Sequence, residues 1–556
     1  MDQAAVPAVF NYQPIPAAVG AYYSQSKQPP SNGTTFTAGQ WIQLPIVTGR
    51  IGQFYDPQRC YFMFQVEMTT AVGLMLERVG AHAFFESVEL WLNGQPLEQI
   101  QQYNCLMQLI RDQYYGLGRS DVCADVEGCA MEGQVGYSFS TTAASAAVGR
   151  VTGSWGPTGT TTGALPALVT YSGAATIATA ALTDGTARPA PLQPATNGPN
   201  AIIGGTAITQ SRWFAVPILS GLLGTLAAKA FPALVFAPGS LFWQIKLAQP
   251  AAPGTRVTVA NIAVAATNTM QGFTFTTYNA ADIWTIKNFN FVTGAVTLQS
   301  GVAATILSAA ASGQLDLNTK SFTNVYASLA AQSNNANIIV PLRKLSLNSI
   351  FVTFRDPNRE TASGGSAAYG GFLSRIAPTG CLVESFTAQW RFGNELIREY
   401  PYQQSVEFYV EVLRNLHEWM DKELNFCAAL IPLRTRWPAD AGTFVAGQPV
   451  GASYVPVGGF YATYADGTVT GYTCDKASQI VQNCGYFLAL DLDVFSGSSS
   501  TSRSGRNTTG DQITLNLANG TTTSGMFGTR SMRVDFFGMH DLRVNIQAGG
   551  VAVPVS

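Results

Sequence analysis

The chain of 556 residues is longer than one ordinary hydrophobic core supports, so at about 150 to 250 residues per unit we expect two to four structural units. Charged residues make up 12% of the chain, and the net charge is −2. The surface is therefore largely neutral and polar, or is covered by other subunits. Because no run of Lys or Arg occurs, direct binding of nucleic acid phosphates is not expected.

The first 35 residues differ from the rest. Residues 1–35 hold five prolines and few periodic apolar positions, which is typical of an extended arm. The start also lacks the basic region of a secretory signal, so we expect a cytosolic product whose eight cysteines stay reduced. From residue 41 on, short β-branched and aromatic runs predict the strands of an antiparallel sandwich, among them 41–47, 60–68 and 86–92.

Two segments in the middle of the chain stand out. Residues 131–210 are nearly free of charge and rich in Gly, Thr, Ala and Pro, which predicts an ordered insertion with short strands. Residues 214–237 are apolar enough to raise the question of a membrane span. Two prolines, two glycines and Lys229 interrupt that segment, so we expect a buried strand, a turn and a second strand. The sequence AQPAAPG at 248–254 is typical of a boundary between domains.

The second half repeats the plan of the first. Predicted strands precede a helix with a periodic apolar face over 405–420. A loop rich in Gly, Ser and Thr follows at 496–510, and we expect two closing strands at 531–537 and 542–548. The chain therefore contains two versions of one domain plan.

A short pattern, W-x-x-G-x-x-L, occurs once in each half, as WLNGQPL at 91–97 and as WRFGNEL at 390–396. Asn93 and Gly94 favour a tight turn, and Pro96 interrupts strand pairing. We therefore expect the turn to lead from a strand into a helix that covers the open end of the β core. The apolar alternation is offset by one residue between the copies: Val88, Leu90 and Leu92 against Phe386, Ala388, Trp390 and Phe392.

Several of these stretches resemble one family. Residues 86–110 look like a strand, turn and helix of the double jelly-roll major capsid proteins of eukaryotic double-stranded DNA viruses, and 216–236 resemble the end of their first jelly roll. The members from virophages, polinton-like viruses and adintoviruses are similar to this chain at 345–356, 389–401, 487–497, 504–517 and 536–550.

The resemblance implies an all-β protein of two tandem eight-stranded jelly-roll β-sandwiches with short helices and long loop insertions. The domains expected are an N-terminal arm at 1–35, a first jelly roll at 36–250 with the insertion at 131–210, and a second jelly roll at 251–556. Family members form homotrimeric, pseudo-hexameric capsomers of an icosahedral shell. The partners implied are other copies, penton proteins and minor capsid or cement proteins. The protein would be assembled inside the host cell and reside in the virion.

The sequence offers little chemistry. His82, His417 and His540 lack the spacing of metal ligands, and no GxSxG, P-loop, HExxH or CxxC motif occurs. We therefore predict no metal, no cofactor and no catalytic site, and we expect His82 to be a buried structural histidine.

Two acidic clusters offer alternative chemistry. Asp491 and Asp493 lie two residues apart on a predicted strand, a spacing that a glycoside hydrolase or a calcium site uses. We favour a solvent-facing or interface strand as the explanation of this pair, with Leu490, Leu492 and Val494 as its apolar side. Asp356 with Arg355 and Arg359 is expected to be a salt-bridged loop. A second alternative is a viral attachment or carbohydrate-binding sandwich that binds through its Thr- and Gly-rich loops. The favoured prediction is a structural protein and not an enzyme.

Overall fold

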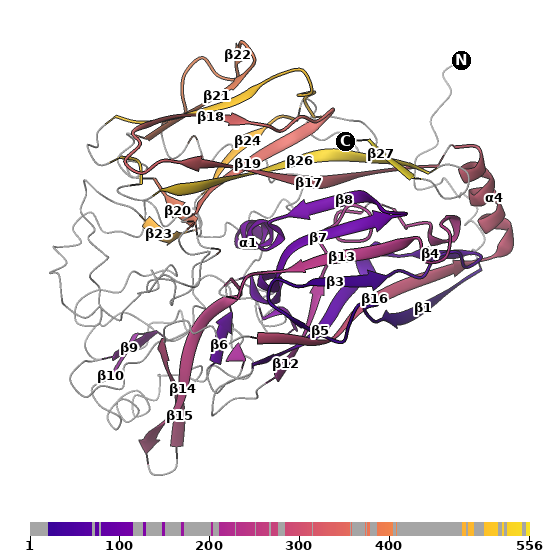
Figure 1. The fold of residues 1–556 in the computed structure, drawn as a ribbon, viewed down its shortest axis with the longest axis horizontal. Coiled ribbons are helices and arrows are strands. Elements are labelled where there is room, and N and C mark those ends of the chain that lie inside the picture. The colour runs from indigo at the N-terminus through magenta and orange to yellow at the C-terminus, as the bar shows by residue number, and fades with distance from the viewer. Residues whose placement is uncertain are drawn as a thin grey trace, which may run out of the picture.

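The computed structural model describes most strands of both halves (Figure 1). The residues described are 20–68, 73–76, 79–114, 126–128, 147–150, 168–171, 202–203, 211–227, 229–250, 252–265, 268–275, 284–313, 315–355, 357, 373, 375–378, 386–403, 407, 481–484, 487–493, 505–520, 525–527, 531–546 and 552–555. Most of the predicted insertion at 131–210 and of the predicted helix at 405–420 lies outside them.

The second half is a complete jelly roll. Its eight strands, lettered B to I in chain order, form two sheets with the orders B-I-D-G and C-H-E-F, the double-sheet arrangement of this fold. The strands B to I are β17 (Leu315–Leu329), β18 (Asn335–Val340), β19 (Leu347–Arg355), β21 (Phe386–Phe392), β22 (Glu395–Leu396), β24 (Leu488–Asp491), β25 (Ile513–Asn519) and β26 (Met532–Ile546). The two closing strands predicted at 531–537 and 542–548 are one continuous strand, β26.

The first half has the same strand order in both sheets. Its strands B to I are β1 (Ala21–Gln28), β3 (Trp41–Pro45), β5 (Tyr61–Met68), β7 (Phe85–Leu92), β8 (Gln95–Gln101), β12 (Ser211–Pro217), β13 (Leu241–Leu247) and β16 (Trp284–Leu298). Two short strands, β2 (Thr35–Thr37) and β4 (Gln53–Tyr55), extend the pairing of β16. The prediction of two tandem eight-stranded jelly rolls is confirmed.

Two predicted domain limits do not match this pairing. Strand β1 pairs along its whole length with β16, so residues 21–28 belong to the first sandwich and not to an arm. Strand β16 also pairs with β5, so the first sandwich continues past residue 250, its expected end. The chain passes to the second sandwich through the helix α4 (Ser300–Ala311). The segment at 248–254 is therefore not a boundary between the domains, because it begins a connection between two strands of the first sandwich.

The repeated W-x-x-G-x-x-L pattern is the E–F hairpin of each sandwich. Residues 93 and 94 form a two-residue turn between β7 and β8, and both have positive φ, 49° for Asn93 and 80° for Gly94. The predicted change from strand to helix at Pro96 is wrong, because Pro96 lies in β8 and pairs with Trp91. It is tolerated there since β8 is an edge strand and a bulge lies beside the pair. The helix, α1 (Tyr103–Tyr114), begins after β8 ends.

The one-residue offset between the two hairpins is confirmed. Val88, Leu90 and Leu92 are buried in β7, and Trp91 between them is partly exposed. In β21 the tryptophan itself, Trp390, is buried together with Ala388 and Phe392. The two sandwiches are therefore diverged copies of one plan.

Smaller elements surround the two sandwiches. The apolar segment 214–237 contains the end of β12, turns and a short 3-10 helix, and none of the described helices is long and apolar enough to cross a membrane. The remaining strands are β6 (Gly73–Leu76), β9 (Ala147–Arg150), β10 (Leu168–Tyr171), β11 (Ile202–Ile203), β14 (Gly254–Ala265), β15 (Asn268–Phe275), β20 (Arg375–Ala377), β23 (Val481–Cys484) and β27 (Ala552–Val555). The 3-10 helices are η2 (Pro57–Arg59), η3 (Gly80–Phe84) and η5 (Ala233–Val235).

The long connections leave from one end of the molecule. In the first sandwich, 102–210 joins F to G and 248–283 joins H to I; in the second, 356–385 joins D to E and 397–487 joins F to G. Because successive strands of each sandwich run in opposite directions, the connections that follow strands D, F and H leave from the same end. Figure 1 shows α4 at the opposite end of the strands.

Candidate functional site: the junction between the two sandwiches

The two sandwiches share a hydrophobic core. Every residue of β19 is buried, since the first sandwich covers one face of its sheet and the second core covers the other. Phe351 in β19 and Phe537 in β26 belong to the cluster that includes the first sandwich, whereas their neighbours Ile350 and Phe536 belong to the second cluster. Because alternate residues of a strand point to opposite faces, this B-I-D-G sheet forms a layer common to both cores. The two halves therefore pack as one block.

Glu98 in β8 links the halves by hydrogen bonds. Its carboxylate accepts from the Gly221 N–H at 2.9 Å, from the Ser220 hydroxyl, and from the Ser321 hydroxyl of β17 at 2.6 Å. The side chain is fully buried, and this burial raises its pKa while the three hydrogen bonds oppose the shift. A buried carboxylate with this many donors fixes how the loop after β12 and strand β17 lie against β8.

The backbones come close at the same place. A Cβ atom at Gly221 would lie 2.3 Å from the Lys320 carbonyl oxygen of β17, so only glycine fits there. The Thr319 hydroxyl donates to the Leu226 carbonyl at 3.2 Å. The loop after β12 is therefore in direct contact with the second sandwich.

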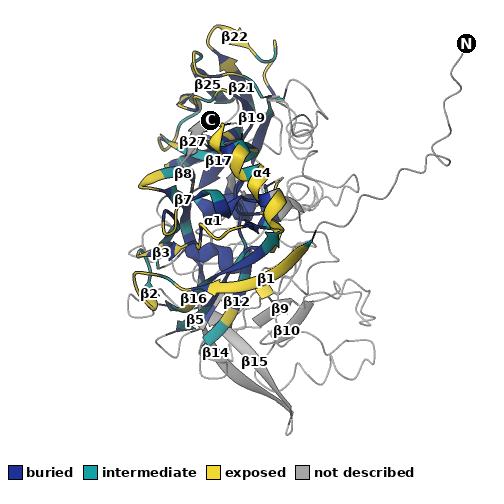
Figure 2. Cartoon of the chain, turned by 90° about the vertical axis from the view of Figure 1, so that its right-hand side faces the viewer, coloured by how far each residue is buried: buried dark blue, intermediate teal, exposed yellow. Residues whose placement is uncertain are grey.

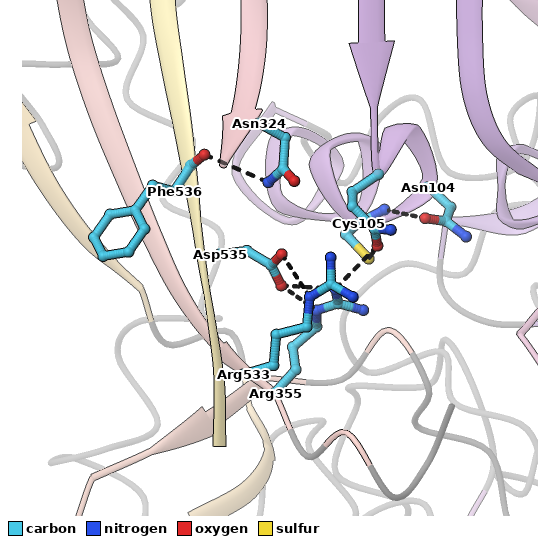
Figure 3. Close-up of polar contacts among 8 residues, drawn as sticks. Asn104, Cys105, Asn324, Arg355, Arg533, Asp535 and Phe536 are labelled. Carbon is cyan, nitrogen blue, oxygen red and sulfur yellow. Dashed lines mark hydrogen bonds and ion pairs between the residues drawn. The ribbon is translucent and has the colours of Figure 1, made fainter. Parts of the chain in front are cut away.

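A buried ion-pair network forms the second polar contact (Figure 3). Asp535 in β26 accepts from Arg355 Nε at 2.8 Å and from Arg533 Nε at 2.9 Å. Arg355 also donates to the Gln102 side chain, which follows β8 in the first sandwich, at 3.0 Å. The side chains of Arg355 and Asp535 are 1% and 0% exposed. The prediction that Arg355 belongs to a salt-bridged loop with Asp356 is therefore wrong, because Arg355 is buried and pairs with Asp535. Asp356 and Arg359 lie outside the described residues.

A cavity of about 280 Å³ lies between β8 and β17. His540 and Lys344 line it together with polar side chains of both strands, and His540 Nε2 lies 3.0 Å from the Thr323 hydroxyl. Burial, and then the charge of Lys344, lower the pKa of His540 to about 3, and burial lowers the pKa of Lys344 to about 8. A histidine with so low a pKa is a poor general base, so the Thr323 contact does not provide an activated nucleophile.

The other histidine with a described position, His82, is fully buried. It lies 2.8 Å from an Arg111 nitrogen of α1, and Arg111 forms an ion pair with Glu127. Burial and the Arg111 charge lower the pKa of His82 to about 4. Within the described ranges no group of three His, Cys, Asp or Glu side chains is placed to hold a metal ion. His82 therefore attaches α1 to the core, and His417 lies outside the described residues.

Asp491 and Asp493 are engaged in local contacts. Asp491 is the last residue of β24, and its carboxylate accepts from the Asp493 N–H at 3.0 Å. The Asp493 carboxylate in turn accepts from the Asn348 amide at 2.8 Å. Strand β24 ends at Asp491, but the expected alternation continues past it, because Leu490 and Leu492 are buried and Asp491 and Asp493 are half-buried. Cys60 and Cys105 are buried thiols that are not joined in a disulfide.

Sequence features predicted most of the strands but not the junction. Glu98 and Ser321 are 223 residues apart, and Arg355 and Asp535 are 180 apart. A single acidic residue within the apolar alternation of β8, and a charged pair within the apolar runs of β19 and β26, are the only signals that the sequence offers.

Comparisons with known proteins bear on the fold. No model of a known protein family matches the chain, and no curated protein matches it either. Solved structures do match. The quasi-atomic model of the PBCV-1 virus capsid is similar over 98% of this chain and 99% of that chain, with a TM-score of 0.51 and 10% sequence identity. The Faustovirus major capsid protein is similar over 98% of this chain and 93% of that one, with a TM-score of 0.53 and 10% identity.

These similarities establish the class of fold. The chain is a double jelly-roll protein, with the architecture of viral major capsid proteins. The resemblance noted in the sequence is confirmed for the fold.

Proposed function

We propose that the chain is the major capsid protein of a double-stranded DNA virus and that three copies form a pseudo-hexagonal capsomer. The observation that carries the proposal is the presence of two jelly rolls of identical strand order in one block with a shared core. Three such blocks around a three-fold axis present six similar sandwiches, which approximates a hexagon. The rigid junction serves this role because it fixes the angle between the two sandwiches.

The surface supports self-association. Charged residues are only 12% of the chain, and a low charge density is typical of the centre of protein interfaces. Several large apolar side chains of the sandwiches are exposed in the single chain: Trp41, Trp213, Tyr326, Ile339, Leu345 and Tyr400. Contacts with other copies would cover such side chains.

The two ends of the block suit different positions in a shell. The end with the long connections would face outward, and the insertion at 131–210 would contact neighbouring subunits within the trimer. The end that carries α4 would face inward, where the segment before Gly20 would reach a neighbouring capsomer or a minor capsid protein. Penton and cement proteins would complete the shell, and assembly would take place in the host cell before the protein resides in the virion.

The test is the oligomeric state of the purified full-length chain. We expect a native mass three times that of the chain and a hexagonal outline in negative-stain images. A monomer, or an oligomer without three-fold symmetry, would refute the capsomer. The hydrolase alternative gains no support from Asp491 and Asp493, whose carboxylates accept local hydrogen bonds. Most of the Thr- and Gly-rich loops of the glycan-binding alternative lie outside the described residues.

A further inference from the structure

The helix α4 has an unusual composition for an exposed position. Its twelve residues, SGVAATILSAAA, include no charged side chain. Ala303 and Ala310 are buried, and α4 contacts β17 and η5. Its exposed residues are Ser300, Gly301, Ala304, Thr305, Leu307, Ser308 and Ala311. Helices of this length are marginal on their own, and a helix without a charged face is normally covered.

Strand β1 continues this surface. The Gln299 N–H, just before α4, donates to the Gly20 carbonyl, just before β1, at 3.1 Å. Figure 2 shows both elements on the side of the molecule that is turned to the viewer, and both are largely exposed. Tyr22 is 65% exposed and Leu307 is 39% exposed. We name the exposed residues of α4, together with the exposed residues of β1 that lie on the same side, the α4–β1 face.

The chain itself supplies a segment of matching chemistry beside this face. Residues 1–19, MDQAAVPAVFNYQPIPAAV, end next to Gly20 and contain one charged side chain, Asp2. The segment is rich in apolar side chains, including Phe10 and Ile15, and its prolines disfavour a helix. Fully extended, it spans about 60 Å, enough to cross to an adjacent block.

We propose that residues 1–19 of one copy bind the α4–β1 face of a copy in a neighbouring capsomer. The inference rests on the proposed function and deepens it by naming the surface that joins capsomers. Because each copy carries both the segment and the face, two copies can exchange segments across a two-fold axis. Both surfaces are almost free of charge, so little charge is desolvated on binding.

The sequence before Gly20 favours a neighbouring copy over the segment's own face. Residues 13–19, QPIPAAV, contain no Gly, Asn or Asp that would form a tight reversal. The two prolines also bias the preceding residues toward extended backbone. This composition therefore favours a neighbouring copy as the binding partner of the segment.

The first experiment measures binding in trans. A fluorescent synthetic peptide of residues 1–19 is titrated with trimers of a variant that lacks residues 2–19. We expect saturable binding that Leu307→Glu weakens by roughly tenfold or more. The matched control is Leu396→Glu in β22, because Leu396 is 41% exposed and Leu307 39%; it should leave the affinity unchanged. Absence of saturable binding, or equal effects of the two substitutions, would overturn the proposal.

The second experiment separates a neighbouring copy from the segment's own copy. Full-length trimers, diluted to nanomolar concentration, should bind the peptide as tightly as the truncated trimers, because their faces are free. A segment bound within its own trimer acts at an effective concentration of about millimolar, so it would weaken the apparent affinity of the peptide by tenfold or more. Native mass measurement first establishes whether the chain forms trimers. Trimers that fail to bind the peptide refute this inference alone, whereas a monomeric chain refutes the proposed function.

Discussion

The buried network at Asp535 allows a quantitative test of the junction. Asp535→Asn keeps the shape of the side chain but removes the negative charge between Arg355 and Arg533. Arg355 is 1% exposed, so its guanidinium would stay buried and lose the Asp535 carboxylate. Removing one partner of a buried pair costs about 3 to 5 kcal/mol. For a sandwich of this size the melting temperature should fall by on the order of 10 °C.

The matched control is Asp316→Asn in β17. Asp316 pairs with Arg543 of β26 at 2.5 Å, but their side chains are 27% and 46% exposed. An exposed pair contributes about 0 to 1 kcal/mol, so this variant should melt within about 4 °C of the unmodified chain.

The assay is thermal unfolding of both variants at one protein concentration and one scan rate, since assembly and irreversibility affect the melting temperature. Adding Arg355→Met to Asp535→Asn removes the buried guanidinium as well and should restore part of the loss. Equal shifts for Asp535→Asn and Asp316→Asn would refute the assignment of Asp535 as a buried counter-charge.

Three further predictions concern the junction. The folded pKa of Glu98 is raised, so the stability of the unmodified chain falls as pH rises from 4.5 through that pKa. Glu98→Gln lacks this titration, so its melting temperature should rise relative to that of the unmodified chain over this range. An opposite trend would contradict the assignment. Because the pKa of His540 is lowered to about 3, stability is lost as pH falls below about 6.5, and His540→Gln should flatten this loss in melts at pH 7 and 5. Gly221→Ala places a Cβ 2.3 Å from the Lys320 carbonyl oxygen and should lower the melting temperature, whereas Gly510→Ala, with no atom within 4 Å, should not; equal melting would remove the close contact.

Local patterns predicted most strands because one face of each is buried. Strands such as β5 and β13 alternate buried and partly exposed residues, as their sequences indicate. Strand β1 escaped prediction since its residues are exposed on both faces and only pairing with β16 makes it a strand. The role of β16 was missed for a related reason: the sheet that a strand joins depends on partners distant in the sequence.

The polar contacts of the junction depend on the same long-range information. Glu98 meets Ser321 only after both sandwiches have formed, so no spacing in the sequence marks the pair. Pro96 misled the prediction of β8, because proline is excluded from central strands but not from an edge strand beside a bulge. The function suggested by the resemblance needs the whole arrangement of two sandwiches, which local patterns imply only in part.

The capsomer itself is tested most directly by electron microscopy of the purified full-length chain, combined with native mass measurement. Two fused jelly rolls per chain predict trimers of hexagonal outline, in which six similar densities surround a three-fold axis. Monomers, or rings whose densities do not number six, would contradict the proposal that this chain builds a viral shell.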